Sequence, residues 1–435
     1  MADLYQVVQV PSFLWSWPAR FCYAKVVRML VLGGEEGEGR DATEWNLDEV
    51  YTAVTQFTEL RSLSIDRTAI PAYSFTDIIE ALPRLEHFHT RSSEKGLDPY
   101  SFTPSRWPWN NPIPHAPNLT TIKLYEISVD ERFGCPDDGV ILLSALSCLP
   151  SLTTLRVDIL SWQSLCNGRN YDYKLHLPGS LRVLVILPRL GDPLIAPHSD
   201  LDPDELLVAL QICAASLEFL HIIVPYVDRP RSPTAPILRL NSLKEYIGPE
   251  GFLRHLDFPM EVEVVWVSCR SRLVGIDPSV TGDLLSFSRL RFLSVGAWDL
   301  KRHTFHSLLT QLPHLRELSI TPLASLDKDD LLKMTPVLSA CKDLRAISLV
   351  CPLALPSDDY LAVLKAWSSQ APGLQSVRFE SENTWHRSLS SDNQDANGGW
   401  SSWAVRTRLF LPDYYVLLHM EVSPFFAPYI SAQIA

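Results

Sequence analysis

The feature of this chain that most limits its fold is a short phrase that recurs along almost its whole length. The phrase is Leu-x-x-Leu-x-Leu, in which Ile, Val or Phe often replaces the second and third leucines. Clear copies are FTELRSLSI, APNLTTIKL, LPSLTTLRV, LPHLRELSI and CKDLRAISL. A phrase that returns in this way is the signature of a repeat architecture, in which each copy belongs to one structural unit.

The spacing of the phrase indicates which repeat architecture is present. The leading leucines of successive copies are 25 to 47 residues apart, which overlaps and exceeds the roughly 20 to 29 residues of a leucine-rich repeat. The longest step contains MEVEVVWVS, which alternates like a strand, and AKVVRMLVL has a similar rhythm before the first clear copy. The sequence therefore predicts about twelve strands.

The local physics of each unit follows from its periodicity. The last two apolar residues of the phrase are two apart, so they point to one face of a short strand. The stretches between phrases have helical periodicity and end at Pro83, Pro150 and Pro313, and Ser357 is expected to cap the helix DDYLAVLKAW. Because no unit buries its apolar face alone, the units must stack. We expect an α/β fold, a right-handed leucine-rich-repeat solenoid (horseshoe) with a parallel sheet on the concave side and helices on the convex side.

The domain organisation follows from where the phrases begin and end. The predicted parts are an N-terminal cap segment (1–23), a solenoid of about twelve irregular repeats (24–380), a flexible loop (381–403) and a C-terminal capping segment (404–435). The loop is expected to be flexible because it is rich in Ser, Asn, Asp and Gly. The last segment is apolar enough to cover the open end of a repeat array.

Charge and composition limit the partners and the compartment. The net charge of −12 repels phosphate backbones and anionic lipids, so neither nucleic acid nor a membrane is expected as a partner. The most membrane-like window, Leu206 to Val227, is interrupted by Glu218 and predicts a helix followed by a strand. No secretory signal is evident, and the eight dispersed cysteines are expected to be reduced and buried. We expect a cytoplasmic or nuclear protein.

The concave strand face is the expected recognition surface, and its exposed residues are those that flank the buried apolar pair. In three successive repeats these positions combine cations, imidazoles and a tyrosine, which suits an acidic peptide or a phosphorylated protein partner. The alternative is that these polar side chains merely solvate the sheet. Arg378 and Glu380 form a second, weaker patch. The predicted partner-binding residues are His87, His89, Arg91, Lys123, Tyr125, Arg156 and Asp158, with Thr121 and Thr154 beside them.

Catalytic and metal chemistry find little support in the sequence. His87 and His89 alternate onto one face without an obvious third ligand, and His303 and His306 lack the spacing of a zinc-protease helix. No phosphate-binding glycine loop and no GxSxG elbow occurs. We predict no catalytic residue, cofactor or metal, and the enzymatic alternative is a hydrolase or transferase whose site is built from loops such as 166–173.

The irregular repeat length, the Leu-Pro-x-Leu lead-ins and the insertions rich in Pro and Trp resemble the leucine-rich-repeat region of fungal F-box proteins. The resemblance covers about residues 20 to 380 and implies substrate recognition for a Skp-cullin ubiquitin ligase, with the ligase adaptor as a further partner. No F-box is evident, because residues 1–25 are too short for one, so no F-box contact residue is carried over. The alternative is a general leucine-rich-repeat scaffold without a ubiquitin role.

Overall fold

The computed structural model divides the chain into two compact units, which are described separately. The first unit comprises Met1–Ser242 with His255–Asp257, and the second comprises Leu243–Arg254 with Phe258–Ala435. The residues that the structure describes are 7–10, 27–32, 54–66, 78–79, 81–91, 117–125, 146, 149–159, 161–162, 177–187, 201, 203–223, 237–253, 255–257, 261–268, 289–298, 303–322, 326–349, 356–379, 383–387 and 400–404.

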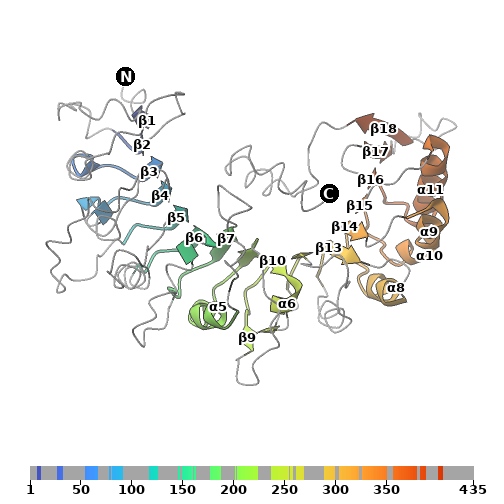
Figure 1. Cartoon of the computed structure of the whole chain (residues 1–435), viewed down its shortest axis with the longest axis horizontal. Helices are drawn as coiled ribbons and strands as arrows, with labels where there is room; N and C mark the ends of the chain where they lie inside the picture. Colours follow the sequence, from blue (N-terminus) through green and yellow to red (C-terminus); the bar gives the residue numbers. More distant parts are fainter. Residues whose placement is uncertain are drawn as a thin grey trace, which may run out of the picture. The chain divides into compact units, whose positions relative to one another are not determined.

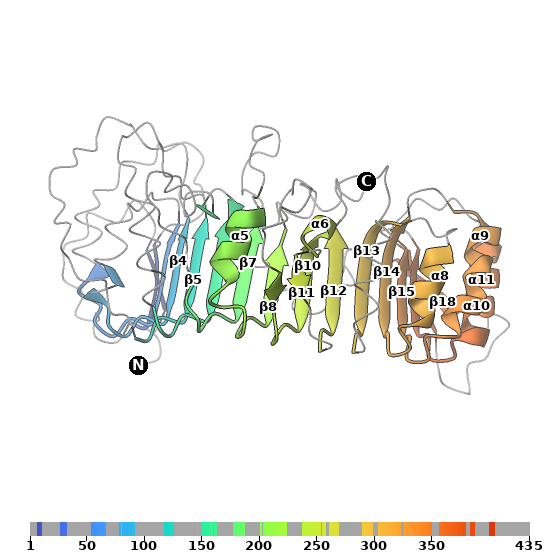
Figure 2. The ribbon, with the colours of Figure 1, turned by 90° about the horizontal axis from the view of Figure 1, so that it is seen from below.

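In its described residues, the first unit is a ladder of eight parallel strands in sequence order. Within each unit the strands lie side by side (Figures 1 and 2). One α-helix of this unit, α5 (Pro203–Leu210), packs Leu206, Leu207 and Leu210 into the core. The strands are β1 (Val7–Val10), β2 (Met29–Leu32), β3 (Ser62–Asp66), β4 (His87–Arg91), β5 (Thr121–Tyr125), β6 (Thr154–Asp158), β7 (Val183–Leu187) and β8 (Phe219–Ile222), beside the small pair β9 (Leu238–Arg239) and β11 (Leu256–Asp257).

The register of these strands shows why the phrase repeats. The second apolar residue of each phrase falls opposite its counterpart in the next strand, and these residues are at most 1% exposed. Burying each such side chain contributes on the order of 1.5–3 kcal/mol, so the row is the main source of cohesion. The row consists of Leu30, Leu63, Phe88, Ile122, Leu155, Leu184 and Leu220.

A polar residue directly before the leading leucine ties several turns to the preceding repeat. Its side chain donates a hydrogen bond to a backbone carbonyl one repeat earlier, so it satisfies an acceptor that the turn leaves open. Ser180 Oγ donates to Leu152 O at 2.7 Å, and Ser216 Oγ donates to Leu181 O at 2.8 Å. The same link is made by Asn118, Ser151 and Ser242.

The second unit continues the pattern and then ends it. Within its described ranges, six strands pair in parallel, and an antiparallel pair follows the last of them. The parallel strands are β10 (Glu245–Pro249), β12 (Val264–Ser268), β13 (Phe292–Trp298), β14 (Glu317–Pro322), β15 (Ala346–Leu349) and β16 (Ser376–Phe379), and the antiparallel strands are β17 (Asn383–Arg387) and β18 (Trp400–Ala404).

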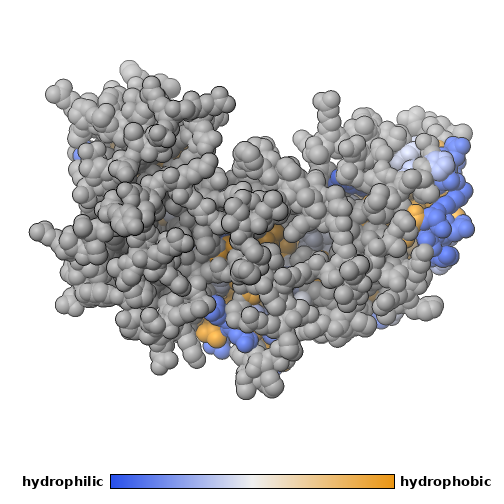
Figure 3. All heavy atoms as spheres, viewed as in Figure 1, coloured by the Kyte–Doolittle hydropathy of each residue, from blue (hydrophilic) through white to orange (hydrophobic). Residues whose placement is uncertain are grey.

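The helices of the second unit lie together on one side of its strands (Figures 1 and 2). Trp367 of α11 is fully buried and donates from Nε1 to Leu331 O of α9 at 3.0 Å. Hydrophilic residues gather on the outer surface over α9 and α11 (Figure 3). These helices are α6 (Glu250–Leu253), α8 (His303–Thr310), α9 (Lys328–Lys333), α10 (Thr335–Leu338) and α11 (Ser357–Gln370).

The ladder defines a leucine-rich-repeat solenoid and confirms the predicted fold class. The hidden strand in the longest step is β12, and the early strand is β2. The window from Leu206 becomes α5 and then β8, as expected. Among the described residues, no helix has the length and apolarity that a membrane crossing requires.

Two local expectations are corrected, and one strand falls in a segment that was predicted only as a cap. The stretch 381–403 was expected to be a flexible loop, yet it contains β17 and most of β18, which pair with each other. Pro356, rather than Ser357, occupies the N-cap of α11 and makes no side-chain cap. A strand, β1, lies within the predicted N-terminal cap segment. The C-terminal capping segment after Ala404 lies outside the described residues.

Candidate binding face and strand edge

The predicted binding residues come from β4, β5 and β6, and the register places most of them in rows on one face. His89 lies opposite Lys123, and Lys123 lies opposite Arg156. We call these three residues the cationic row. Adjacent parallel strands are about 4.8 Å apart, so the row presents its nitrogen-bearing side chains at that spacing.

A second row of polar residues runs beside the cationic row, two residues earlier in each strand. His87 lies opposite Thr121, and Thr121 lies opposite Thr154. His87 is exposed and the two threonines are partly exposed. Because alternate residues of a strand share a face, both rows lie on the face opposite the buried leucines.

The cationic row is partly enclosed by its own sheet. His89, Lys123 and Arg156 are all partly exposed, and His89 Nδ1 is 3.2 Å from Ser64 Oγ of β3. Lys123 and Arg156 place two cations on neighbouring strands. This arrangement attracts carboxylates and phosphates.

Two further predicted residues belong to the same strands. Arg91 and Tyr125 are opposite each other at the ends of β4 and β5. Their side chains lie outside the described part of the structure, as do the side chains of His303 and His306 and the loop 166–173.

Asp158 was wrongly predicted to bind a partner. Its side chain is 0% exposed, and its Oδ1 accepts a hydrogen bond from Ser161 N at 2.8 Å. The residue therefore holds the turn that follows β6 instead of facing a partner. The patch proposed around Arg378 is corrected for the same reason, because Arg378 is only 6% exposed and its burial lowers its pKa.

The face changes character after β6, which sequence reasoning missed. Arg156 lies opposite Val185, and Val185 lies opposite His221. Val185 and His221 are both 0% exposed. The signal was present in β7, because VLVIL is apolar at every position and such a run is typical of a strand buried on both faces. The accessible polar rows therefore end at β6.

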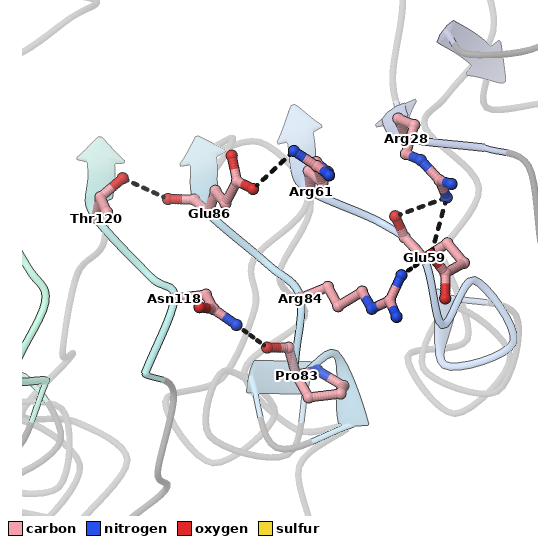
Figure 4. Close-up of polar contacts among 8 residues, drawn as sticks. All are labelled: Arg28, Glu59, Arg61, Pro83, Arg84, Glu86, Asn118 and Thr120. Carbon is pink, nitrogen blue, oxygen red and sulfur yellow. Dashed lines mark hydrogen bonds and ion pairs between the residues drawn. The ribbon is translucent and has the colours of Figure 1, made fainter.

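A set of ion pairs lies at the edge where the strands begin (Figure 4). We call the residue directly after each leading leucine, or after Val27 and Val262, the edge position. In the first unit Arg61 Nη1 is 3.2 Å from Glu86 Oε1, and Arg182 Nε donates to Glu218 Oε1 at 2.6 Å, so these two cations face acids on the next strand. Glu59 adds contacts with Arg28 and Arg84. Each exposed pair contributes about 0–1 kcal/mol and helps to fix the register.

The side chains of the described residues were also compared with the needs of a metal site. Within those parts of the chain, no three His, Cys, Asp or Glu side chains lie close enough together to hold a metal ion. The two cysteines in this part, Cys213 and Cys341, are buried and free. Burial raises the pKa of Cys213 to about 12 and that of Cys341 to about 11.

The comparisons with known proteins give only distant likenesses. No protein-family model matches the chain, and no curated protein matches it. Among solved structures it is similar to an internalin, InlF, from Listeria monocytogenes, with 12% identity and a TM-score of 0.37 over 76% of this chain and 83% of that one. It is also similar to the Rad7 and Elc1 complex in yeast, with 13% identity and a TM-score of 0.33 over 81% and 75%. A third likeness is to the TLR13–ssRNA13 complex, with 14% identity and a TM-score of 0.32 over 82% and 40%.

Proposed function

We propose that this chain is a protein-binding scaffold that holds an acidic or phosphorylated segment of a partner on the face formed by β4, β5 and β6. The single observation that supports the proposal most is the register, which makes His89, Lys123 and Arg156 direct neighbours. Carboxylate or phosphate oxygens placed over this row could accept hydrogen bonds from both permanent cations.

The chemistry of the row suits recognition rather than catalysis. Arg156 offers a planar fork of donors that matches a carboxylate or phosphate, whereas Lys123 acts as a compact point charge. His87 and His89 add ring nitrogens that can donate hydrogen bonds. Affinity should therefore fall with rising salt, because partly exposed charges are screened over about 8–10 Å.

The test is a double charge reversal, Lys123→Glu with Arg156→Glu, in the full chain. Binding of fluorescein-labelled acidic and phosphoserine peptides should weaken at least tenfold, as measured by fluorescence anisotropy. Lys365→Glu, on an exposed position of α11 in the second unit, is the matched control and should bind like the parent chain. Unchanged binding by the double variant, with circular dichroism showing that it is folded, would reject this face as the site.

A narrower proposal concerns the biological setting of the binding. The repeat style that resembles fungal F-box proteins supports a role in selecting proteins for a Skp-cullin ubiquitin ligase. Co-purification of the full chain with a Skp-type adaptor tests this role directly. Failure to retain the adaptor under conditions where a known F-box protein retains it would reject the ligase role and leave the general scaffold proposal standing.

A further inference from the structure

We propose that the edge of the second unit carries a separate binding surface for an acidic polypeptide segment, formed by Arg291, Arg316, Arg345 and Arg387, which we call the arginine row. The proposal goes beyond the function proposed above, because the row lies in the other unit and at the strand edge. It concerns a second contact with a partner and not the face formed by β4, β5 and β6.

The backbone hydrogen bonds place these arginines on successive rungs. Arg316 N donates to Arg291 O at 2.7 Å, and Arg345 N donates to Arg316 O at 2.7 Å. The series continues through Gln375 N to Arg345 O at 2.9 Å and through Arg387 N to Gln375 O at 2.8 Å. The four arginines and Gln375 therefore occupy one continuous row.

The equivalent position in the first unit shows what is unusual here. There the neighbouring arginines Arg28 and Arg61 are paired with Glu59 and Glu86, and Arg182 is paired with Glu218. In the second unit Arg291 still has a partner, since its Nη1 is 3.4 Å from Glu263 Oε2. The alternation of cation and acid then stops, and the next two rungs are both arginine.

The guanidinium groups at these two rungs are exposed and uncompensated. Among the residues that the structure describes, neither Arg316 nor Arg345 forms an ion pair or a side-chain hydrogen bond. Arg387 donates from Nη1 to Pro372 O at 3.3 Å, and no acid of the described residues pairs with its charge. Lys342, in the turn before β15, is also exposed and adds to the positive potential.

Three acids of this edge are already engaged elsewhere. Glu261 is paired with Arg289, and Asp343 Oδ2 is 3.1 Å from His314 Nδ1. Glu263 is held by Arg291, as described above. The acidic character of the whole chain, with a net charge of −12, makes the excess of cations along this one row more notable.

The geometry favours a short extended acidic segment as the ligand. Five rungs separated by about 4.8 Å span roughly 19 Å, and an extended polypeptide of about six residues covers the same length. Each guanidinium binds a carboxylate through two parallel hydrogen bonds, so alternate carboxylates of such a segment would separate the like charges of the row. A long polyanion is less suitable, because the overall negative charge of the chain repels it.

The test uses the full chain and a fluorescein-labelled peptide of twelve residues with alternating Glu and Ser, followed by fluorescence anisotropy at low and moderate salt. In a chain that already carries Lys123→Glu and Arg156→Glu, Arg316→Gln with Arg345→Gln should weaken binding at least tenfold and reduce its salt dependence. Arg182→Gln changes the same edge position at a compensated rung of the first unit, so it is the matched control and should bind like the parent. Arg316→Lys with Arg345→Lys keeps the charge, loses the fork and should give an intermediate affinity.

The Lys123→Glu and Arg156→Glu background separates this surface from the face proposed above. A loss caused by the arginine variants in that background supports the row, whatever the fate of the first proposal. Equal binding by the parent and the double Gln variant, both folded by circular dichroism, would overturn the inference. Tighter binding of a single-stranded DNA of the same charge than of the peptide would overturn the assignment to an acidic polypeptide.

Discussion

The contact between α9 and α11 allows a quantitative test of how neighbouring repeats hold each other. Trp367 is 0% exposed, its Nε1 donates to Leu331 O at 3.0 Å, and its ring centroid lies 5.8 Å from that of Phe379. Replacing a buried tryptophan by alanine removes the ring and leaves a cavity, which costs about 3–5 kcal/mol. We expect this range for Trp367→Ala.

Trp367→Phe separates packing from hydrogen bonding. Phenylalanine keeps most of the ring, so the loss consists of one hydrogen bond and part of the buried area. Leu331 O still accepts from Met334 N at 3.1 Å, so the carbonyl is not left without a donor. The hydrogen bond then contributes at the lower end of about 0.5–1.5 kcal/mol, and the total should be about 1–2 kcal/mol.

Urea unfolding followed by far-ultraviolet circular dichroism measures both free energies of unfolding, and amide exchange locates the effect in α9 and α11. Lys365→Ala, at an exposed position of α11, should change the free energy by less than about 0.5 kcal/mol. A cost below about 1 kcal/mol for Trp367→Ala, or equal costs for the two tryptophan variants, would refute the packing argument.

Three other predictions follow from the described side chains. Ser216→Ala should lower the free energy of unfolding by about 1 kcal/mol in urea titrations, because Ser216 Oγ no longer donates to Leu181 O; a cost indistinguishable from zero would mean that the carbonyl finds water instead. Cys213 and Cys341 should resist iodoacetamide at pH 8 until urea is added, since their pKa values of about 12 and about 11 exceed the ordinary value of 9.0. The folded chain holds the two thiol protons more tightly than the unfolded chain, so the free energy of unfolding should decline as pH rises above about 9. Labelling of the cysteines in native buffer at the rate of a free thiol would contradict their burial. Glu317 lies between Phe292 and Ala346, and burial raises its pKa. Glu317→Gln should therefore increase the stability at pH 7 and remove the loss of stability that develops above pH 4.5. Unfolding midpoints at pH 4 and pH 7 test this, and a lower stability of the variant at pH 7 would show that the carboxylate is stabilised.

Most of the fold could be predicted because each repeat follows one simple pattern, in which every second residue of a strand is buried. The register of Leu63, Phe88 and Ile122 follows from aligning their phrases. The strands that the sequence did not predict lack the repeated phrase. β1 has no leading leucine, and β17 and β18 occur in a stretch whose polar composition is typical of loops.

The binding face was predicted less completely, for a reason that lies in the turns. Alternation placed His89, Lys123 and Arg156 on one face, which the register supports. Alternation cannot tell whether a residue at the end of a strand is turned inward by the segment that follows. Asp158 is such a residue, because Ser161 N draws its carboxylate into the buried turn.

In each unit, the edge positions of successive strands form a column of residues. Each rung contributes one residue to this column, so the interaction of neighbouring rungs depends on two residues that lie about thirty positions apart in the sequence. An arginine beside a glutamate stabilises the register, as Arg61 does with Glu86, whereas an arginine beside an arginine costs energy in the free protein. The phrases around Arg316 and Arg345 both have arginine directly after the leading leucine, and the structure makes them adjacent through a 2.7 Å hydrogen bond. The first unit also has neighbouring arginines at its edge, Arg28 and Arg61, but these are paired with Glu59 and Glu86. Among the described residues Arg316 and Arg345 have no such acid, so their pair is best explained by an anion that the chain meets outside itself.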